Sequence, residues 1–455
     1  MSRDGFDLAV RDGLVVGPSG RRRATVYVRG GRVALVSHEH LPAAREVDAS
    51  DLLVLPGMVD THVHFMDPGD PEREDFPSGT AAAACAGVTT VIEHTHARPV
   101  RTAAELAEKR EHLAGRSLVD FGLAAHAWPE HLGELEGLWR AGAAYVKAFT
   151  CSTHGVPGLD AAHLLELFRR AAAAGATCLV HCEDDSITAW AEAALRGAGR
   201  EDAPVVCEWR NRDAEAAATA VTALLARRTG AAVVVAHASS PEIVELARRE
   251  RREGARLLVE SCPQYLLLRE DELRELGPFR KFTPPARARS ERELERMWDA
   301  LADGRVHHVG SDHAPSTRAQ KTGGSIWDVH FGLPGVDTTL PVLLDGAHAG
   351  RLSYERVVEA YAEAPARAYG LWPRKGTLRD GADADLVLVD PEARWTVRDE
   401  DVVSKAGWSP FAGRTFVGRA VATYVRGALV AEGRRVVAEP GAGAFLPGAG
   451  AEAGG

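Results

Sequence analysis

Residues 56–69, PGMVDTHVHFMDPG, form a short apolar run that ends in two histidines, His62 and His64. Residues two apart in a strand point to the same face, so both imidazoles can reach one ion. Four further apolar runs each carry one polar residue near their end: AAYVKAF, ATCLVH, AAVVVAH and HHVGSDHAP, with Lys147, His181, His237 and Asp312. Strand ends of this kind meet at one mouth if the strands share a sheet, and the sequence therefore predicts one site from these six residues.

The region around these runs alternates between strand-like and helix-like segments. Expected strands cover 58–65, 88–94, 119–126, 143–149, 176–182, 231–238, 256–262 and 306–313, and expected helices include 102–114, 159–174, 213–228, 241–253 and 290–302. Such alternation predicts a parallel sheet. Eight units in this length favour an α/β fold of the (β/α)8 TIM-barrel type over an open doubly wound sheet, because no Gly-rich phosphate loop follows the first strand.

Both ends of the chain have a different sequence pattern, in which short strand-like runs are separated by Gly-containing turns. FDLAVRDGLVV and ATVYVRGGRVALV precede the barrel, and DADLVLVD and GRAVATYVRGALV follow it. We expect a small β-sandwich domain from residues 1–55 and 371–440, with the (β/α)8 barrel over 56–370. The Gly/Ala-rich residues 441–455 are expected to form a disordered tail.

Composition narrows the class of protein. The 455 residues are 45% hydrophobic and carry a formal net charge of −10, which disfavours a nucleic-acid partner. No apolar run approaches the roughly 20 residues of a membrane span, and no secretory signal is apparent. The six cysteines lack CxxC spacing, which predicts neither a disulfide framework nor a zinc finger and fits a reducing cytoplasm.

Each polar residue at a strand end also has a plainer explanation. His181 or His237 alone could be a hydrogen-bonded core histidine, and their common placement at consecutive strand ends favours ligands. An unpaired buried Asp312 would cost several kcal/mol, which a neighbouring cation would remove. A buried cationic Lys147 would be unfavourable there, so it reaches solvent, pairs with an acid, or is neutralised. Carbamylation by carbon dioxide would turn it into a carboxylate-like bridge between two metals.

The runs PGMVDTHVHFMDPG, VKAF, LVHCED, VVVAHAS and VGSDHAP together resemble the cyclic-amide branch of the amidohydrolase superfamily, which contains dihydroorotases, allantoinases, hydantoinases and dihydropyrimidinases. The resemblance covers nearly the whole chain. It implies two divalent metal ions, usually Zn²⁺. His62, His64 and Asp312 would hold one ion, His181 and His237 the other, and carbamylated Lys147 would bridge both.

The resemblance also implies an enzyme, a hydrolase of carbon–nitrogen bonds in cyclic amides. A hydroxide bridging the two metals would attack the ring carbonyl. Asp312 is the expected proton shuttle to the leaving ring nitrogen. The product would be an open-chain N-carbamoyl-type acid. The only partner expected is a small cyclic amide, and the family suggests a homo-oligomer, a dimer or tetramer.

Several positions depart from each subfamily. Dihydroorotases carry arginine where this chain has Met66, and an MPN run where it has EHTHARP. Hydantoinases carry tyrosine at the position of Ser152 and asparagine at that of Phe331. The best match is therefore an allantoin- or hydantoin-like ring. The positions expected to contact it are Met66, His94, His96, Arg98, Cys151, Ser152, Thr153, Cys262, Pro263, His313, Phe331 and Gly335.

Some alternatives remain open at this level. His94 and His96 either bind substrate or hydrogen-bond neighbouring loops. Arg98 is either a substrate anchor or a surface residue. Within the class, the alternative is a divergent dihydroorotase. Outside it, the alternative is a non-catalytic scaffold related to dihydropyrimidinases, which would lack stoichiometric zinc.

Overall fold

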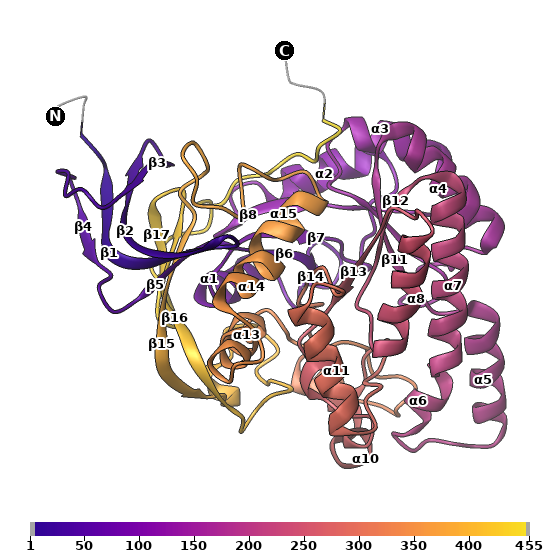
Figure 1. The fold of residues 1–455 in the computed structure, drawn as a ribbon. Helices are drawn as coiled ribbons and strands as arrows, with labels where there is room; N and C mark the ends of the chain where they lie inside the picture. The colour runs from indigo at the N-terminus through magenta and orange to yellow at the C-terminus, as the bar shows by residue number, and fades with distance from the viewer. Residues whose placement is uncertain (1–4, 452–455) are drawn as a thin grey trace.

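A small β domain is built from both ends of the chain in the computed structural model, which describes residues 5–451. Its N-terminal strands are β1 (Leu8–Gly17), β2 (Gly20–Arg29), β3 (Arg32–Ser37), β4 (Glu46–Asp48) and β5 (Leu53–Pro56). Its C-terminal strands are β15 (Leu386–Thr396), β16 (Thr415–Val425), β17 (Ala428–Glu432) and β18 (Arg435–Val436). Antiparallel pairing of β5 with β15 joins the two halves, which lie side by side in Figure 1.

The small domain differs from the expected sandwich in one respect. Within the described residues its nine strands form one hydrogen-bonded sheet, in the order β18-β17-β16-β15-β5-β1-β2-β3 with β4 beside β1. Apolar side chains from distant parts of the sheet, among them Leu8, Val26 and Leu386, pack in one cluster. A long twisted sheet thus buries its own apolar face without a second sheet.

Parallel strands form the central region between these halves. They are β6 (Met58–Val63), β7 (Val88–Glu93), β8 (Asp120–Leu123), β9 (Ala125–His126), β10 (Val146–Phe149), β11 (Thr177–His181), β12 (Ala232–Val235), β13 (Leu257–Ser261) and β14 (His308–Val309). β8 and β9 are two parts of one strand, since β8 pairs with β7 and β9 with β10. The described order is therefore β6-β7-β8/β9-β10-β11-β12-β13-β14.

The two outer strands of this order also meet. Val63 at the end of β6 forms a parallel bridge with His313, and His64 N–H donates to the His313 carbonyl at 2.7 Å. Val59, Ile92, Leu179 and Val234, each from a different strand, pack in one cluster. Both observations support the expected barrel.

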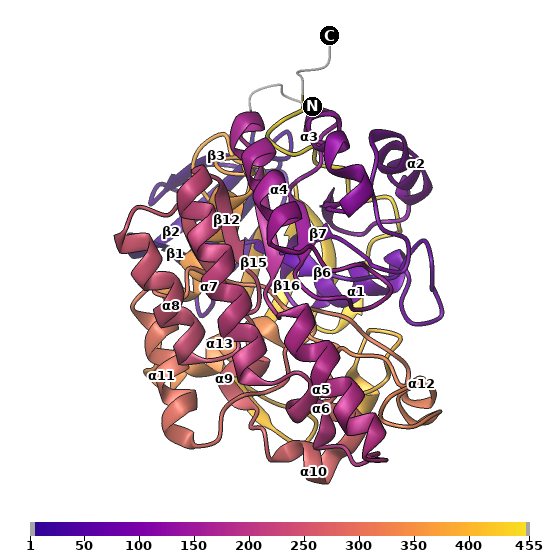
Figure 2. The same ribbon diagram turned by 90° about the vertical axis from the view of Figure 1, so that its right-hand side faces the viewer.

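Helices connect the parallel strands and also follow the last of them, before β15. They are α1 (Phe76–Cys85), α2 (Ala103–Leu113), α3 (Leu135–Arg140), α4 (Ala161–Ala174), α5 (Asp185–Gly197), α6 (Val205–Trp209), α7 (Arg212–Thr229), α8 (Pro241–Arg252), α9 (Gln264–Leu267), α10 (Glu272–Leu276), α11 (Glu291–Ala302), α12 (Arg318–Thr322), α13 (Thr339–His348), α14 (Tyr354–Val358) and α15 (Ala364–Ala368). Helices α4, α5, α7 and α8 form an outer layer that faces the viewer in Figure 2. Within residues 5–451, no helix has the length and apolar character that a membrane span requires.

One buried lysine ties the small domain to the central strands. Lys375 Nζ donates to Asp120 at the start of β8 and to Asp385 at 2.8 Å, and lies 2.9 Å from Asp383. Lys375 and Asp120 are fully buried. The three acids hold the pKa of Lys375 above its usual value in spite of its burial. The charge is therefore retained, and it connects β8 to the segment that leads into β15.

Residues 441–451, which composition predicts to be disordered, instead follow the edge of the central strands. Phe445 bridges Phe121, Leu446 N–H donates to the Phe121 carbonyl at 2.7 Å, and Gly448 N–H donates to the Gly142 carbonyl. A Cβ at Gly443 would lie 1.8 Å from the Val119 carbonyl oxygen, so the small residues permit close backbone contact. Residues 452–455 lie outside the described part of the chain.

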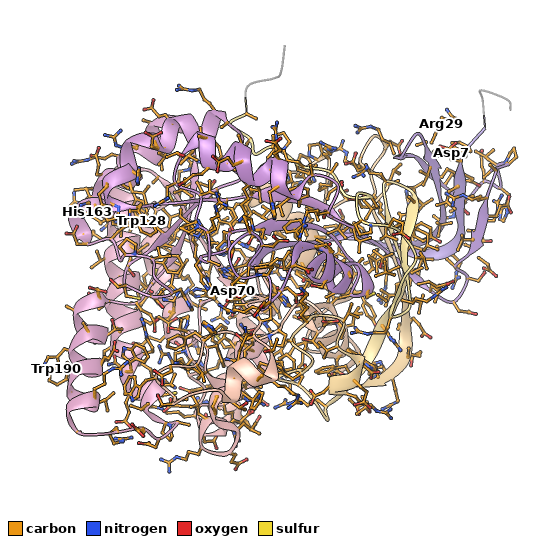
Figure 3. All side chains as sticks on the ribbon, turned by 180° about the vertical axis from the view of Figure 1, so that it is seen from behind. Asp7, Arg29, Asp70, Trp128, His163 and Trp190 are labelled. Atoms are coloured by element: carbon orange, nitrogen blue, oxygen red, sulfur yellow. The ribbon has the colours of Figure 1, made fainter. Side chains whose placement is uncertain are left out.

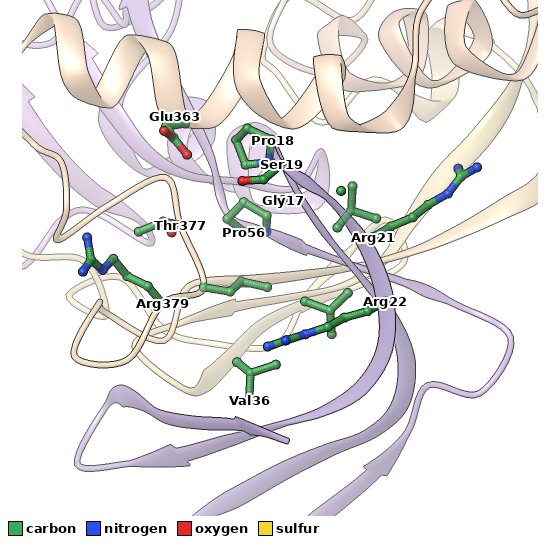
Figure 4. A pocket seen from close by; sticks show the side chains of 14 residues that line it. Gly17, Pro18, Ser19, Arg21, Arg22, Val36, Pro56, Glu363, Thr377 and Arg379 are labelled. Carbon is green, nitrogen blue, oxygen red and sulfur yellow. The ribbon is translucent and has the colours of Figure 1, made fainter. Parts of the chain in front are cut away.

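An open groove lies between the N-terminal strands of the small sheet and the segment around Glu363 (Figure 4). It is lined by residues that include Arg21, Arg22, Pro56, Thr377 and Arg379. None of its lining residues belongs to the cavity that holds the histidines described next.

Candidate metal centre

The six residues that the sequence places at strand ends line one small cavity: His62, His64, Lys147, His181, His237 and Asp312. They come from β6, β10, β11 and the segments that follow β6, β12 and β14. All six are buried. The cavity is narrow, with a volume of about 20 Å³. The prediction that these distant residues meet is thus matched by their position in the structure.

The distances between the nitrogen and oxygen atoms suit metal binding. His62 Nε2 lies 3.2 Å and His64 Nε2 3.4 Å from Asp312 Oδ1, and His181 Nδ1 lies 3.0 Å from His237 Nε2. Zinc ligands about 2.0–2.2 Å from a common centre lie roughly 3.3–3.6 Å apart in a tetrahedron. Lys147 Nζ, 3.5 Å from His62 Nε2, lies within the same group.

Burial also gives these groups the protonation states that a metal requires. It lowers the pKa of His62 and His181, and lowers the pKa of His64 and His237 well below the usual value. Neutral imidazoles are the ligand form of histidine. Burial lowers the pKa of Lys147 to about 8, which makes a neutral amine accessible for reaction with carbon dioxide. The residues present therefore fit a metal pair and a modified lysine.

Backbone strain accumulates at the same place. Among residues 5–451, six non-glycine residues have positive φ, and four of them lie at or beside this cavity: Met66, His154, His237 and Asp312. Such conformations cost of order 1–3 kcal/mol each and cluster at functional sites. Since His237 and Asp312 are both expected ligands, the strain marks the positions where side-chain direction is most tightly constrained.

Two buried acids that contact the histidines, Glu260 and Glu183, were not predicted from the sequence. His62 Nδ1 donates to Glu260 Oε1 at 2.6 Å, and His181 Nε2 donates to Glu183 Oε2 at 2.8 Å. Burial would raise the pKa of Glu183, but His181 and Arg210 lower it to about 2. Carboxylates in this position fix the tautomer of a ligand and raise its basicity. The available signal was an acid at the end of an apolar run, LLVES and LVHCE.

Replacing Glu260 should therefore weaken metal binding while the protein remains folded. We expect Glu260→Gln to lower metal affinity roughly 10- to 100-fold, as found when such a supporting carboxylate is lost. Competition with a chelator measures this, with exposed Glu432→Gln as the matched control. Unchanged affinity in Glu260→Gln would show that Glu260 only packs against His62.

The expected substrate positions divide into two groups. His96 and Phe331 line the cavity, together with Phe149, His154, Thr283, Ala314 and Gly332. His94 lies behind His64, with ring centroids 4.2 Å apart, and its Nδ1 is 2.7 Å from the Tyr145 hydroxyl oxygen. His96 therefore lies on the cavity wall, whereas His94 lies behind His64 and does not line the cavity.

The remaining expected positions lie away from the cavity wall. Arg98 is on the surface, where it forms an ion pair with Glu108 and its side chain is 61% exposed. Ser152 is exposed, and Cys151 Sγ contacts Arg210. His313 Nδ1 accepts from the backbone N–H groups of Gly335 and Val336, which holds the following loop. Met66, Thr153, Cys262 and Pro263 are buried beside the site and do not line the cavity.

Comparison with known proteins agrees with this geometry. Residues 53–430 match the model of the family described as Amidohydrolase family. The chain is 40% identical over 405 residues to the dihydroorotase of Halobacterium salinarum, covering 87% of this chain and 90% of the relative. It is 38% identical over 455 residues to the allantoinase of Rubrobacter xylanophilus, covering 97% of each. The solved structure of L-hydantoinase (dihydropyrimidinase) from Arthrobacter aurescens superposes with a TM-score of 0.92 at 33% identity, covering 97% of this chain and all of that one.

Proposed function

Since the chain belongs to the amidohydrolase family, we propose that it is a metal-dependent cyclic amidase built on a (β/α)8 barrel. The proposed substrate is an allantoin- or hydantoin-like ring, and the product an open-chain N-carbamoyl-type acid. The observation that carries the proposal is the meeting of six ligand-type residues around one buried cavity. The relatives named above are hydrolases of cyclic amides, which supports the same reaction class.

We assign His62, His64 and Asp312 to one metal ion and His181 and His237 to the other. Lys147, once carbamylated, offers an oxygen to each. Two divalent cations bound there would supply a hydroxide nucleophile near neutral pH. The nitrogen and oxygen donors favour zinc among the common metals.

The protein's own groups then perform the remaining tasks. Asp312 lies within 3.2–3.4 Å of both histidines of its group and has no lysine or arginine ion pair among the described residues. Its carboxylate can take a proton from the attacking nucleophile and pass it to the ring nitrogen as the amide bond breaks. Glu260 and Glu183 hold the imidazoles in place. His154 and Phe331, whose rings meet edge to face at 5.8 Å, also line the cavity.

A divergent dihydroorotase is the second candidate within the class, favoured by the 40% identity to the Halobacterium salinarum enzyme. A non-catalytic scaffold is disfavoured because none of the six ligand-type residues is missing. We also propose a homo-oligomer. Trp190 on the outer face of α5 (Figure 3), with Val221 and Leu224 on the neighbouring α7, is an exposed apolar group that such contacts would cover.

Elemental analysis combined with a substrate panel tests the function. We expect about two zinc ions per chain, in line with a two-metal site. We expect turnover of allantoin or a hydantoin from a panel that also contains dihydrouracil, dihydroorotate and cyclic imides. A protein with less than about half an ion per chain would contradict the two-metal proposal. Turnover of dihydroorotate alone would replace the first candidate with the second.

A further inference from the structure

Arg73, a cation beside the cavity, forms no ion pair with an acid among residues 5–451. Arg73, in the segment between β6 and α1, is 3% exposed. Its Nε donates to the Pro315 carbonyl at 2.9 Å, and its Nη1 lies 3.5 Å from His96 Nε2. Its Nη2 is buried without a hydrogen-bond partner in the described part of the chain. The nearest influential acid is Asp70 on the same loop (Figure 3), and no ion pair forms between them.

Other buried cations near the site have an acid or several backbone carbonyls as partners, whereas Arg73 has one carbonyl and His96. Arg210 and Arg287 both lie within ion-pair distance of Glu183. Lys281 Nζ donates to the carbonyls of Ile326, Trp327 and Val329, and Lys321 Nζ to those of Lys281 and His330. A buried charge without a partner costs several kcal/mol. Arg73 therefore has no anionic partner among the described residues, and an anion from outside the protein would stabilise its charge.

His96 connects Arg73 to the cavity, because it contacts Arg73 and lines the cavity wall. A guanidinium has donors and no acceptor, so His96 Nε2 accepts from Arg73 and the ring proton is on Nδ1. His96 Nδ1 is buried and has no partner among the described residues, although His96 lines the cavity. The His96 ring stacks on His154 at 4.3 Å, which fixes its plane. An oriented N–H donor, backed by a positive charge, thus borders the substrate space.

We propose that the Arg73–His96 pair binds the carboxylate of the substrate, so that the preferred ring is a cyclic amide with an anionic substituent. The proposal rests on the proposed function and narrows its substrate class. Within the described part of the chain, Asp312 is the one carboxylate that lines the cavity, and it lies beside His62 and His64. An entering carboxylate would receive N–H donors from the Arg73–His96 side and would neutralise the guanidinium.

A pair of matched substrates tests the proposal. The first is hydantoin with a carboxymethyl group on carbon 5, and the second is the uncharged amide of the same compound. We expect wild-type protein to prefer the acid in kcat/KM. Arg73→Met should lower kcat/KM for the acid roughly 10- to 150-fold, the loss expected for a hydrogen bond to a charged group, and leave the amide unchanged. Arg73→Lys, which keeps the charge without the planar fork, should recover part of the loss.

The outcomes separate this inference from the proposed function. If wild-type protein hydrolyses neither compound nor any other ring in the panel, the proposed function fails. If it hydrolyses both compounds equally, or if Arg73→Met slows both by the same factor, Arg73 is structural and the inference is overturned. Calorimetric titration with the acid gives a second readout, in which weaker binding to Arg73→Met at unchanged zinc content supports the inference. Exposed Arg435→Met is the matched control.

Discussion

Lys147→Ala should lose most of its metal and at least about a thousandfold in hydrolysis rate, since a metal centre contributes several kcal/mol to such reactions. Lys147 is the only residue among the six that sits between both proposed ligand groups, 3.5 Å from His62 and on the strand next to β11, which carries His181. Without its bridging group, the buried imidazoles would have to hold two cations with a single carboxylate. Metal per chain and kcat, measured on the same preparation, check the result.

Adding a short carboxylic acid to Lys147→Ala tests directly whether Lys147 supplies a bridging group. Acetate or propionate can occupy the space left by the lysine side chain and offer two oxygens in its place. We expect partial recovery of metal content and rate with increasing acid concentration. Lys405→Ala, which alters a partly exposed lysine, is the control for the loss of a lysine as such. Full activity of Lys147→Ala without added acid would show that Lys147 is no bridge.

Asp312→Asn should reduce kcat roughly 10²- to 10⁴-fold, the range for loss of a general acid–base group. The change keeps the size of the side chain and one oxygen for a metal, and removes the ability to hold a transferred proton. The positive φ of 49° at this residue means that a poorly tolerated replacement would also disturb the backbone, and asparagine accepts such a conformation well. The measurement is kcat at saturating zinc, together with the zinc content.

Metal dependence distinguishes the two roles of Asp312. If excess zinc restores Asp312→Asn to wild-type kcat, the carboxylate serves as a ligand alone. If zinc content is restored while kcat stays low, the carboxylate moves a proton. Asp328→Asn, on the exposed side of the loop that precedes Phe331, supplies the matched control.

The strands of the central region could be predicted because each is a short apolar run with a polar end. Expected strand 176–182 and helix 241–253 correspond to β11 (Thr177–His181) and α8 (Pro241–Arg252) within two residues. Helix α1 was missed because Pro77 and Gly79 interrupt its sequence. The structure shows that Asp75 caps it and that Pro77 occupies its first turn, where proline is tolerated.

The meeting of the six residues at one cavity was predictable for a similar reason, and the loop residues around the cavity were not. The six positions follow from strand ends, which the alternation of the chain predicts. The paths of the loops depend on tertiary packing. For Arg98, which closely follows His94 and His96, the sequence left a substrate anchor and a surface residue equally open, and the structure places it on the surface. Arg73 is more than twenty residues from His96 in the chain and reaches it only in the folded protein, and nothing in its sequence neighbourhood distinguishes it from a surface arginine.

The shared lysine of the small sheet and the central strands has a consequence for dissecting this protein. A fragment that retained only the catalytic region would keep Asp120 and lose Lys375, Arg426 and the Ala444 amide that contact it. A carboxylate would then remain stranded in an apolar interior, at a cost comparable with the whole stability of a domain. The active region is therefore not a transplantable module. Its two flanking segments supply the partners of the buried Asp120. A chimera should therefore exchange both chain ends together with the central strands.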